Sequence, residues 1–96
     1  MGDRTELYDL ITRRWMGGSR GVGRPGDEEA VRTIILMHMK KGKDNSVNEI
    51  RWLSADEAMA RASWYVGPLG AEFYYYVLQR GRSGWKIVAR YLYGAA

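Results

Sequence analysis

The stretch that decides the fold is EFYYYVLQRGRSGWKIVARYLY, from Glu72 to Tyr93. It holds five of the seven tyrosines and one of the four tryptophans, and it contains no proline. Apolar and polar residues alternate on both sides of a glycine-containing turn, a pattern that predicts two antiparallel strands joined as a hairpin, over about 71–80 and 85–93. The length of the turn decides which rings share a face of the sheet.

Two loop lengths fit this turn, and each sorts the rings differently. A two-residue loop at 82–83 places one set of alternate residues on the face of Trp85: Tyr74, Tyr76 and Leu78. A three-residue loop ends at Gly84, which suits the left-handed residue of a G1 bulge, and it places the other set there: Phe73, Tyr75 and Val77. The longer loop gives one clean apolar face, and register tends to follow such a partition. We therefore expect Trp85 and Tyr75 to face inward together, beneath both helices.

The opposite face in this register mixes tyrosines and aliphatic residues with basic ones. Its composition is too apolar for a freely solvated sheet face. We therefore expect a second copy of the chain to cover it. The predicted homodimer interface consists of Tyr74, Tyr76, Leu78, Val88, Arg90 and Leu92.

The hydrophobic period changes once along the rest of the chain. Apolar residues recur at helical spacing before residue 42 and predict helices over about 4–16 and 28–41, with Asp27 as the N-cap of the second. From Val47 onward the period is two, which predicts strands over about 47–54 and 58–66. In the second strand Ala58, Ala60, Ala62 and Trp64 share one face. Two helices followed by a four-stranded meander predict a single α+β domain over residues 1–96.

Composition limits the partners and the location. The chain has 96 residues, a formal net charge of +4 and no cysteine, which excludes disulfides and thiolate zinc sites. We expect neither a metal nor a cofactor. The N-terminal residues lack a signal-peptide pattern, and no apolar run approaches the roughly 20 residues of a membrane span, so we expect a cytoplasmic protein that does not contact membranes. The basic residues are scattered, which favours a solvated surface over a nucleic-acid interface.

Two stretches within residues 47–93 are IRWLSADEAMARASWYV, from Ile50 to Val66, and GWKIV, from Gly84 to Val88. With these features, residues 47–93 resemble the C-terminal meander of the NTF2-like superfamily (SnoaL-like and ketosteroid isomerase-like proteins, with a cystatin-like α+β fold). The resemblance implies helices packed on a curved sheet, a conical pocket between them, and frequent dimerisation through the outer sheet face. Enzymes of the superfamily place carboxylates and tyrosines inside the cone. Here Glu49 and Glu72 are expected to point away from the apolar face, which does not favour an enzyme, because a proton-transfer base needs a buried carboxylate.

The side chains expected to line the pocket are Trp15, His38, Trp52, Trp64, Tyr75 and Tyr91. An apolar lining with a few polar groups is typical of a small-molecule site, so we predict a homodimer that binds a small apolar ligand. One alternative is a SnoaL-type or isomerase-type enzyme in which His38 or Tyr75 transfers a proton. A second alternative is nucleic-acid binding through the basic, tyrosine-bearing outer sheet face.

Overall fold

The computed structural model describes residues 4–19, 24–39, 45–67 and 70–95. Two helices precede four strands: α1 (Arg4–Gly17), α2 (Asp27–His38), β1 (Asn45–Ser54), β2 (Glu57–Gly67), β3 (Gly70–Gly81) and β4 (Gly84–Ala95). The strands form one antiparallel sheet in the order β1-β2-β3-β4. The predicted α+β meander is therefore confirmed. Residues 40 and 41, where the second helix was expected to end, lie outside the described residues.

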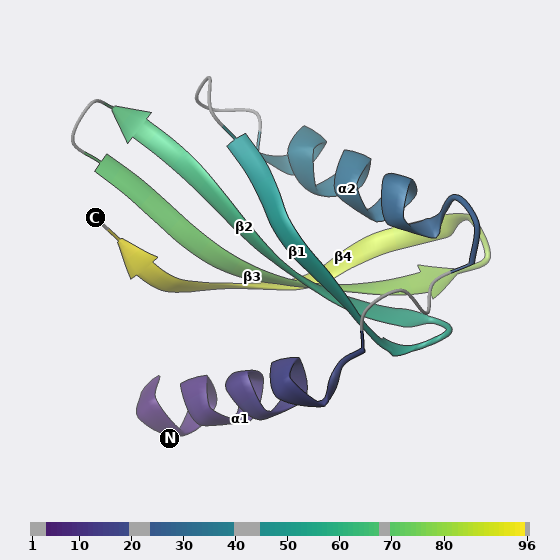
Figure 1. Ribbon diagram of the computed structural model, residues 1–96, viewed down its shortest axis with the longest axis horizontal. Helices are drawn as coiled ribbons and strands as arrows, with labels where there is room; N and C mark the ends of the chain where they lie inside the picture. Colours follow the sequence, from purple (N-terminus) through teal and green to yellow (C-terminus); the bar gives the residue numbers. More distant parts are fainter. Residues whose placement is uncertain (1–3, 20–23, 40–44, 68–69, 96) are drawn as a thin grey trace.

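The two helices lie on opposite faces of the sheet (Figure 1). The expectation that both helices share one face is wrong. Helix α2 packs Val31, Ile35 and Met39 onto one face, which we call the α2 face. Helix α1 packs Ile11 and Trp15 onto the other, which we call the α1 face. The sheet is thus apolar on both sides, and each side has its own core.

Small side chains on β2 make room for α2, which approaches the sheet most closely at the edge strands β1 and β4. Ala58, Ala60 and Ala62 share the α2 face, as the alternation of the sequence predicted, and all three are fully buried. Val31 and Ile35 of α2 belong to the same core and are also fully buried. Burying a Val or Ile side chain completely contributes about 1.5–3 kcal/mol, so this contact holds α2 in place.

The β3–β4 hairpin has a two-residue loop, and the expectation of a three-residue loop is wrong. Gly81 pairs with Gly84 across the turn, and Leu78 pairs with Ile87. Gly84 has a φ of 112°, the positive φ expected at this residue, but it pairs with Gly81 as the first residue of β4 instead of ending the loop. Trp85 consequently shares the α2 face with Leu78, Tyr76 and Tyr74, whereas Tyr75 lies on the α1 face.

A β-bulge at Val88 reconciles the two alternative registers. Leu78 pairs with Ile87, but the preceding residue Val77 pairs with Ala89, so Val88 has no counterpart on β3. An extra residue in one strand moves every later side chain of that strand to the other face. Trp85 and Ile87 therefore face α2, whereas Ala89 and Tyr91 face α1. The pairing of the two-residue loop holds from the turn to Ile87. The pairing of the three-residue loop, which we favoured, holds from Ala89 to Leu92, and a second shift follows at Tyr93.

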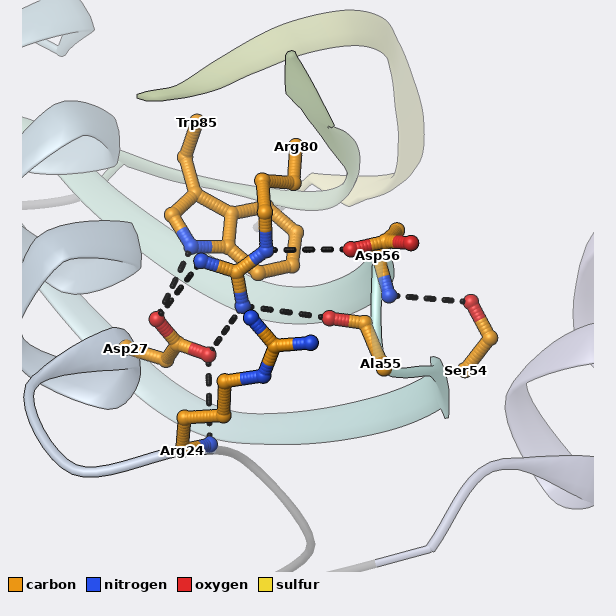
Figure 2. Close-up of polar contacts among 7 residues, drawn as sticks. All are labelled: Arg24, Asp27, Ser54, Ala55, Asp56, Arg80 and Trp85. Atoms are coloured by element: carbon orange, nitrogen blue, oxygen red, sulfur yellow. Dashed lines mark hydrogen bonds and ion pairs between the residues drawn. The ribbon is translucent and has the colours of Figure 1, made fainter. Parts of the chain in front are cut away.

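A partly buried ion pair ties the start of α2 to the β3–β4 hairpin (Figure 2). Arg80 donates through both terminal nitrogens to the Asp27 carboxylate, with Nη1 3.1 Å from Oδ1. The indole nitrogen of Trp85 donates to the same oxygen at 3.3 Å, and the backbone N–H of Arg24 donates to Oδ2 at 3.1 Å. These hydrogen bonds, chiefly those from the Arg80 side chain, lower the pKa of Asp27, although burial acts in the opposite direction.

Asp27 is therefore not the N-cap of α2, as the sequence had suggested. The N-cap is Gly26, which has a φ of 87° and makes no side-chain capping hydrogen bond. Asp27 is the first helical residue, and its carboxylate faces Arg80 instead of the free N–H groups of its own helix. Arg80 also donates from Nε to Asp56 in the β1–β2 turn at 3.1 Å, so one guanidinium connects three segments.

Helix α1 is joined to the sheet by its C-terminal end. The guanidinium of Arg51 donates to the carbonyl oxygen of Trp15 at 3.0 Å, and Arg14 forms an ion pair with Glu57 at 2.6 Å. Just beyond the helix, Ser19 exchanges two backbone hydrogen bonds with Trp52. Gly18 is needed at this crossing, because a Cβ there would lie 2.8 Å from Cβ of Arg51.

Candidate ligand-binding site

The side chains predicted to line a single pocket lie on both sides of the sheet. Trp15, Tyr75 and Tyr91 belong to the α1 face. His38, Trp52 and Trp64 belong to the α2 face. The sheet separates the two groups, so the predicted set does not form one site. The prediction failed for two reasons. It assigned both helices to one face of the sheet, and it assumed that side chains alternate between the two faces without interruption along the whole length of β4.

Three of the predicted lining residues, Trp15, Trp52 and Tyr75, are buried core residues. The ring of Trp15 is 2% exposed and lies 5.5 Å from the ring of Tyr75. The ring of Trp52 is similarly buried, 5.7 Å from the ring of Trp85. Tilted aromatic pairs at these distances stabilise a core. Both tryptophans therefore hold the helices and the hairpin in place.

The predicted dimer interface is wrong at its centre. Tyr74, Tyr76 and Leu78 are 7%, 0% and 0% exposed, and they lie in the core together with α2 of the same chain. The other three predicted interface residues, Val88, Arg90 and Leu92, are exposed on β4. Because Tyr74 and Tyr76 are buried, their rings are also not free to stack on bases, so the nucleic-acid alternative loses the surface on which it depended.

Polar side chains gather on the α2 face around the C-terminal end of α2. Asn45, Trp64 and Glu72 are successive cross-strand neighbours on β1, β2 and β3. Tyr74 and Tyr76 follow on β3, and His38 reaches this region from the last turn of the helix. We call this group the α2-end cluster: His38, Asn45, Trp64, Glu72, Tyr74 and Tyr76.

Two hydrogen-bonded pairs organise the α2-end cluster. The hydroxyl of Tyr74 donates to Oε1 of Glu72 at 2.6 Å, and the hydroxyl of Tyr76 lies 3.2 Å from Nδ1 of His38. The two tyrosine rings are tilted against each other at 6.2 Å. Burial raises the pKa of Tyr74, and the hydrogen bond to the Glu72 carboxylate raises it further. Tyr74 is therefore a protonated hydrogen-bond donor at neutral pH.

The α2-end cluster also contains two buried polar atoms that have no partner among the described residues. Nε1 of Trp64 has no acceptor there, and Oδ1 of Asn45 has no donor. The amide nitrogen of Asn45 is used, since it donates to the carbonyl oxygen of Met39. Buried polar groups are nearly always hydrogen-bonded, and leaving one unpaired costs about 1–3 kcal/mol. Within the described part of the chain, neighbouring strands thus present one unused donor and one unused acceptor.

Sequence reasoning missed four residues of this cluster. Glu72, Tyr74 and Tyr76 were expected on an outer face, and in the structure they share the face of Trp64 and α2. Asn45 lies before the predicted start of the first strand at residue 47, whereas β1 begins at Asn45 itself. The spacing of Glu72, Tyr74 and Tyr76 did predict that these three share a face, but it did not predict which helix covers that face.

The cluster combines a carboxylate, two phenols, an imidazole, an indole N–H and an amide. Of the two residues predicted as proton-transfer candidates, His38 belongs to it and Tyr75 does not, because Tyr75 lies on the α1 face. Among the described residues, no three His, Asp or Glu side chains gather as they do around a metal ion. In the same part of the chain, neither helix is long and apolar enough to cross a membrane.

Comparison with known proteins adds no further constraint. No protein-family model, no curated protein and no solved structure matches the chain. The chemistry of the α2-end cluster is therefore inferred from its geometry and from the charges and hydrogen-bonding groups of its six side chains.

Proposed function

We propose that this chain is a small-ligand-binding domain of the NTF2-like kind, and that the α2-end cluster holds the ligand. The observation that carries the proposal is the buried N–H of Trp64, which has no acceptor among the described residues, next to the buried Asn45 oxygen, which has no donor among them. A group that combines an acceptor with a donor, as a carboxamide does, would satisfy both atoms. The ligand class is therefore a small, mostly apolar molecule that carries one amide-like group.

The surroundings of these two atoms support an apolar ligand body. Val47 and Ala62 pair with each other in the next row of the α2 face, and both are buried. Tyr74 adds an aromatic ring in that row and a hydroxyl group that is held by Glu72. Apolar walls with a few fixed polar groups are the usual composition of a small-molecule site. The order of two helices and a four-stranded meander supports the NTF2-like kinship, although the helices lie on opposite faces of the sheet and do not enclose the single cone that the resemblance implies.

Trp64→Phe tests the proposal, because it removes the unused N–H and keeps an aromatic ring. The probes are benzamide, which has an amide, and toluene, which has none. Binding is detected by the shift in melting temperature, and the affinity is measured by isothermal titration calorimetry. We expect benzamide to bind the wild type and to bind Trp64→Phe about two- to tenfold more weakly, because one buried hydrogen bond contributes about 0.5–1.5 kcal/mol. Toluene should not distinguish the two proteins.

Trp15→Phe is the matched control, since it makes the same change in a ring on the other face of the sheet. It should lower stability without changing the affinity for benzamide. Equal benzamide affinity in the wild type and in Trp64→Phe would refute the assignment of the site. No binding of benzamide to the wild type would refute the ligand class.

A proton-transfer enzyme is a second candidate, favoured by the carboxylate of Glu72 in the cluster. Glu72 was expected to point away, but it lies on the α2 face, 2.6 Å from the hydroxyl of Tyr74. A carboxylate base beside a phenol donor can remove a proton next to a carbonyl group. Deuterium uptake by cyclohexanone, followed by NMR, tests this directly. Glu72→Gln should reduce the catalysed rate by about 10²–10⁴-fold, and the absence of any catalysed exchange by the wild type would exclude this candidate.

A further inference from the structure

Arg61 lies on the α1 face and has no acidic partner among the described residues. Its guanidinium lies over three aromatic rings, with its central carbon 5.4 Å from the ring centre of Trp15, 5.5 Å from that of Tyr75 and 5.4 Å from that of Tyr93. Cation–π contacts stabilise the cation. The rings, however, carry no net charge and accept no conventional hydrogen bond from the guanidinium, so the contacts hold Arg61 in place without neutralising it.

The hydrogen-bonding groups of Arg61 are unused within the described part of the chain. Its Nε is buried without a partner there, and none of the ion pairs among residues 4–19, 24–39, 45–67 and 70–95 includes Arg61. Glu49 is its cross-strand neighbour, but the Glu49 carboxylate accepts instead from Nε of Arg51 at 2.8 Å. Arg61 as a whole is half-buried, but a buried hydrogen-bonding nitrogen without a partner is costly, so this arrangement favours a bound anion.

Neutral polar groups border Arg61 on the same face. Ser63 follows two residues later on β2 and is 4% exposed. Its Oγ lies 3.0 Å from Oγ of Ser46 and accepts from Nδ2 of Asn48 at 3.2 Å. These groups add hydroxyl and amide hydrogen bonds without adding negative charge. The surroundings of Arg61 are therefore compatible with an anion.

We propose that Arg61 is the centre of a second site, on the α1 face, that binds a small oxyanion: a carboxylate or a phosphate. The planar guanidinium presents parallel N–H groups that match two oxygens of such an anion. The three rings hold this plane in place, so little side-chain freedom is lost on binding. The site is separate from the α2-end cluster, because the sheet lies between them.

The test compares sodium phosphate and sodium acetate with sodium chloride at equal ionic strength, which removes general screening effects. At about ten times its Kd, an anion that binds the folded state should raise the melting temperature by about 5 °C or more. We expect this shift in the wild type and no shift in Arg61→Met. Arg61→Lys should show a smaller shift, because it keeps the positive charge but not the planar pair of N–H groups. Arg82→Met is the control, since Arg82 is exposed in the hairpin loop, and it should keep the full shift.

The two anions distinguish the ligand chemistries. A shift with phosphate alone assigns a phosphate group, and a shift with both assigns an oxyanion in general. Tryptophan fluorescence gives a second readout that does not depend on stability, because Trp15 contacts the guanidinium. Should Arg61→Met fail to fold, titration of Arg61→Lys by fluorescence replaces it, with at least a tenfold weaker affinity expected. A shift that persists in Arg61→Met, or no advantage of either anion over chloride, would overturn the proposal.

Discussion

Leu78 and Leu92 offer a matched test of what covers the α2 face of the sheet. Both leucines lie on that face, Leu78 opposite Ile87 and Leu92 opposite Tyr74. They differ in coverage, because Leu78 is fully buried in the core with α2, whereas Leu92 is 56% exposed. The sequence alone had placed both in a dimer interface, where truncating either would matter. The structure predicts that only Leu78 matters for the stability of the monomer.

The expected magnitudes follow from this burial. A Leu→Ala change in a closed core costs about 2–5 kcal/mol, which includes the cavity left behind. In a domain of this size each kcal/mol moves the melting temperature by about 4–8 °C, so Leu78→Ala should lower it by about 8 °C or more. At Leu92 over half of the residue is already in water and no closed cavity forms. The cost of Leu92→Ala should therefore be about 1 kcal/mol or less.

The assay is urea unfolding followed by circular dichroism, for the wild type and both variants, at two protein concentrations that differ about a hundredfold. The midpoints should not depend on concentration, because the covering helix belongs to the same chain. Equal losses for Leu78→Ala and Leu92→Ala would refute the reasoning. So would a loss for Leu78→Ala that grows on dilution, since it would show that a second copy covers this face.

Two further predictions concern the hairpin and its attachment to α2. Because its hydrogen bonds with Arg80 lower the pKa of Asp27 in the folded state, the ionised carboxylate stabilises the fold above about pH 4, and this contribution is lost as the pH falls through the folded pKa. The difference in unfolding free energy between the wild type and Asp27→Asn should therefore be full at pH 7 and shrink in acid; a constant difference down to about pH 2 would contradict this. Gly84→Ala should cost about 1–3 kcal/mol, because φ is 112° there. Gly81→Ala, whose Cβ would meet nothing nearer than 3.7 Å, should cost clearly less, and equal losses in urea unfolding would count against the positive φ of Gly84.

For much of the candidate site, the sequence predicted which residues of a single strand lie on the same face of the sheet. The alternation predicted that Glu72, Tyr74 and Tyr76 share a face, and that Ala62 and Trp64 share one. Both groupings are correct. The alternation could not show which set of residues on one strand shares a face with which set on the next strand. A bulge such as the one at Val88 has no clear sequence signal when both faces are apolar. The membership of the α2-end cluster was therefore lost, although its components were correctly grouped.

The sequence by itself determined the element order and approximate bounds, the antiparallel meander and the positive φ of Gly84, because these depend on local periodicity and on backbone conformations that favour glycine. Only the tertiary structure decided which face each helix covers, which residues the turn pairs, and that Trp85 and Tyr75 lie on opposite sides. The physical reason is that both faces of β3 are apolar, so burying either one gains similar free energy. The choice between them rests on the helices and the bulge, not on the strand itself.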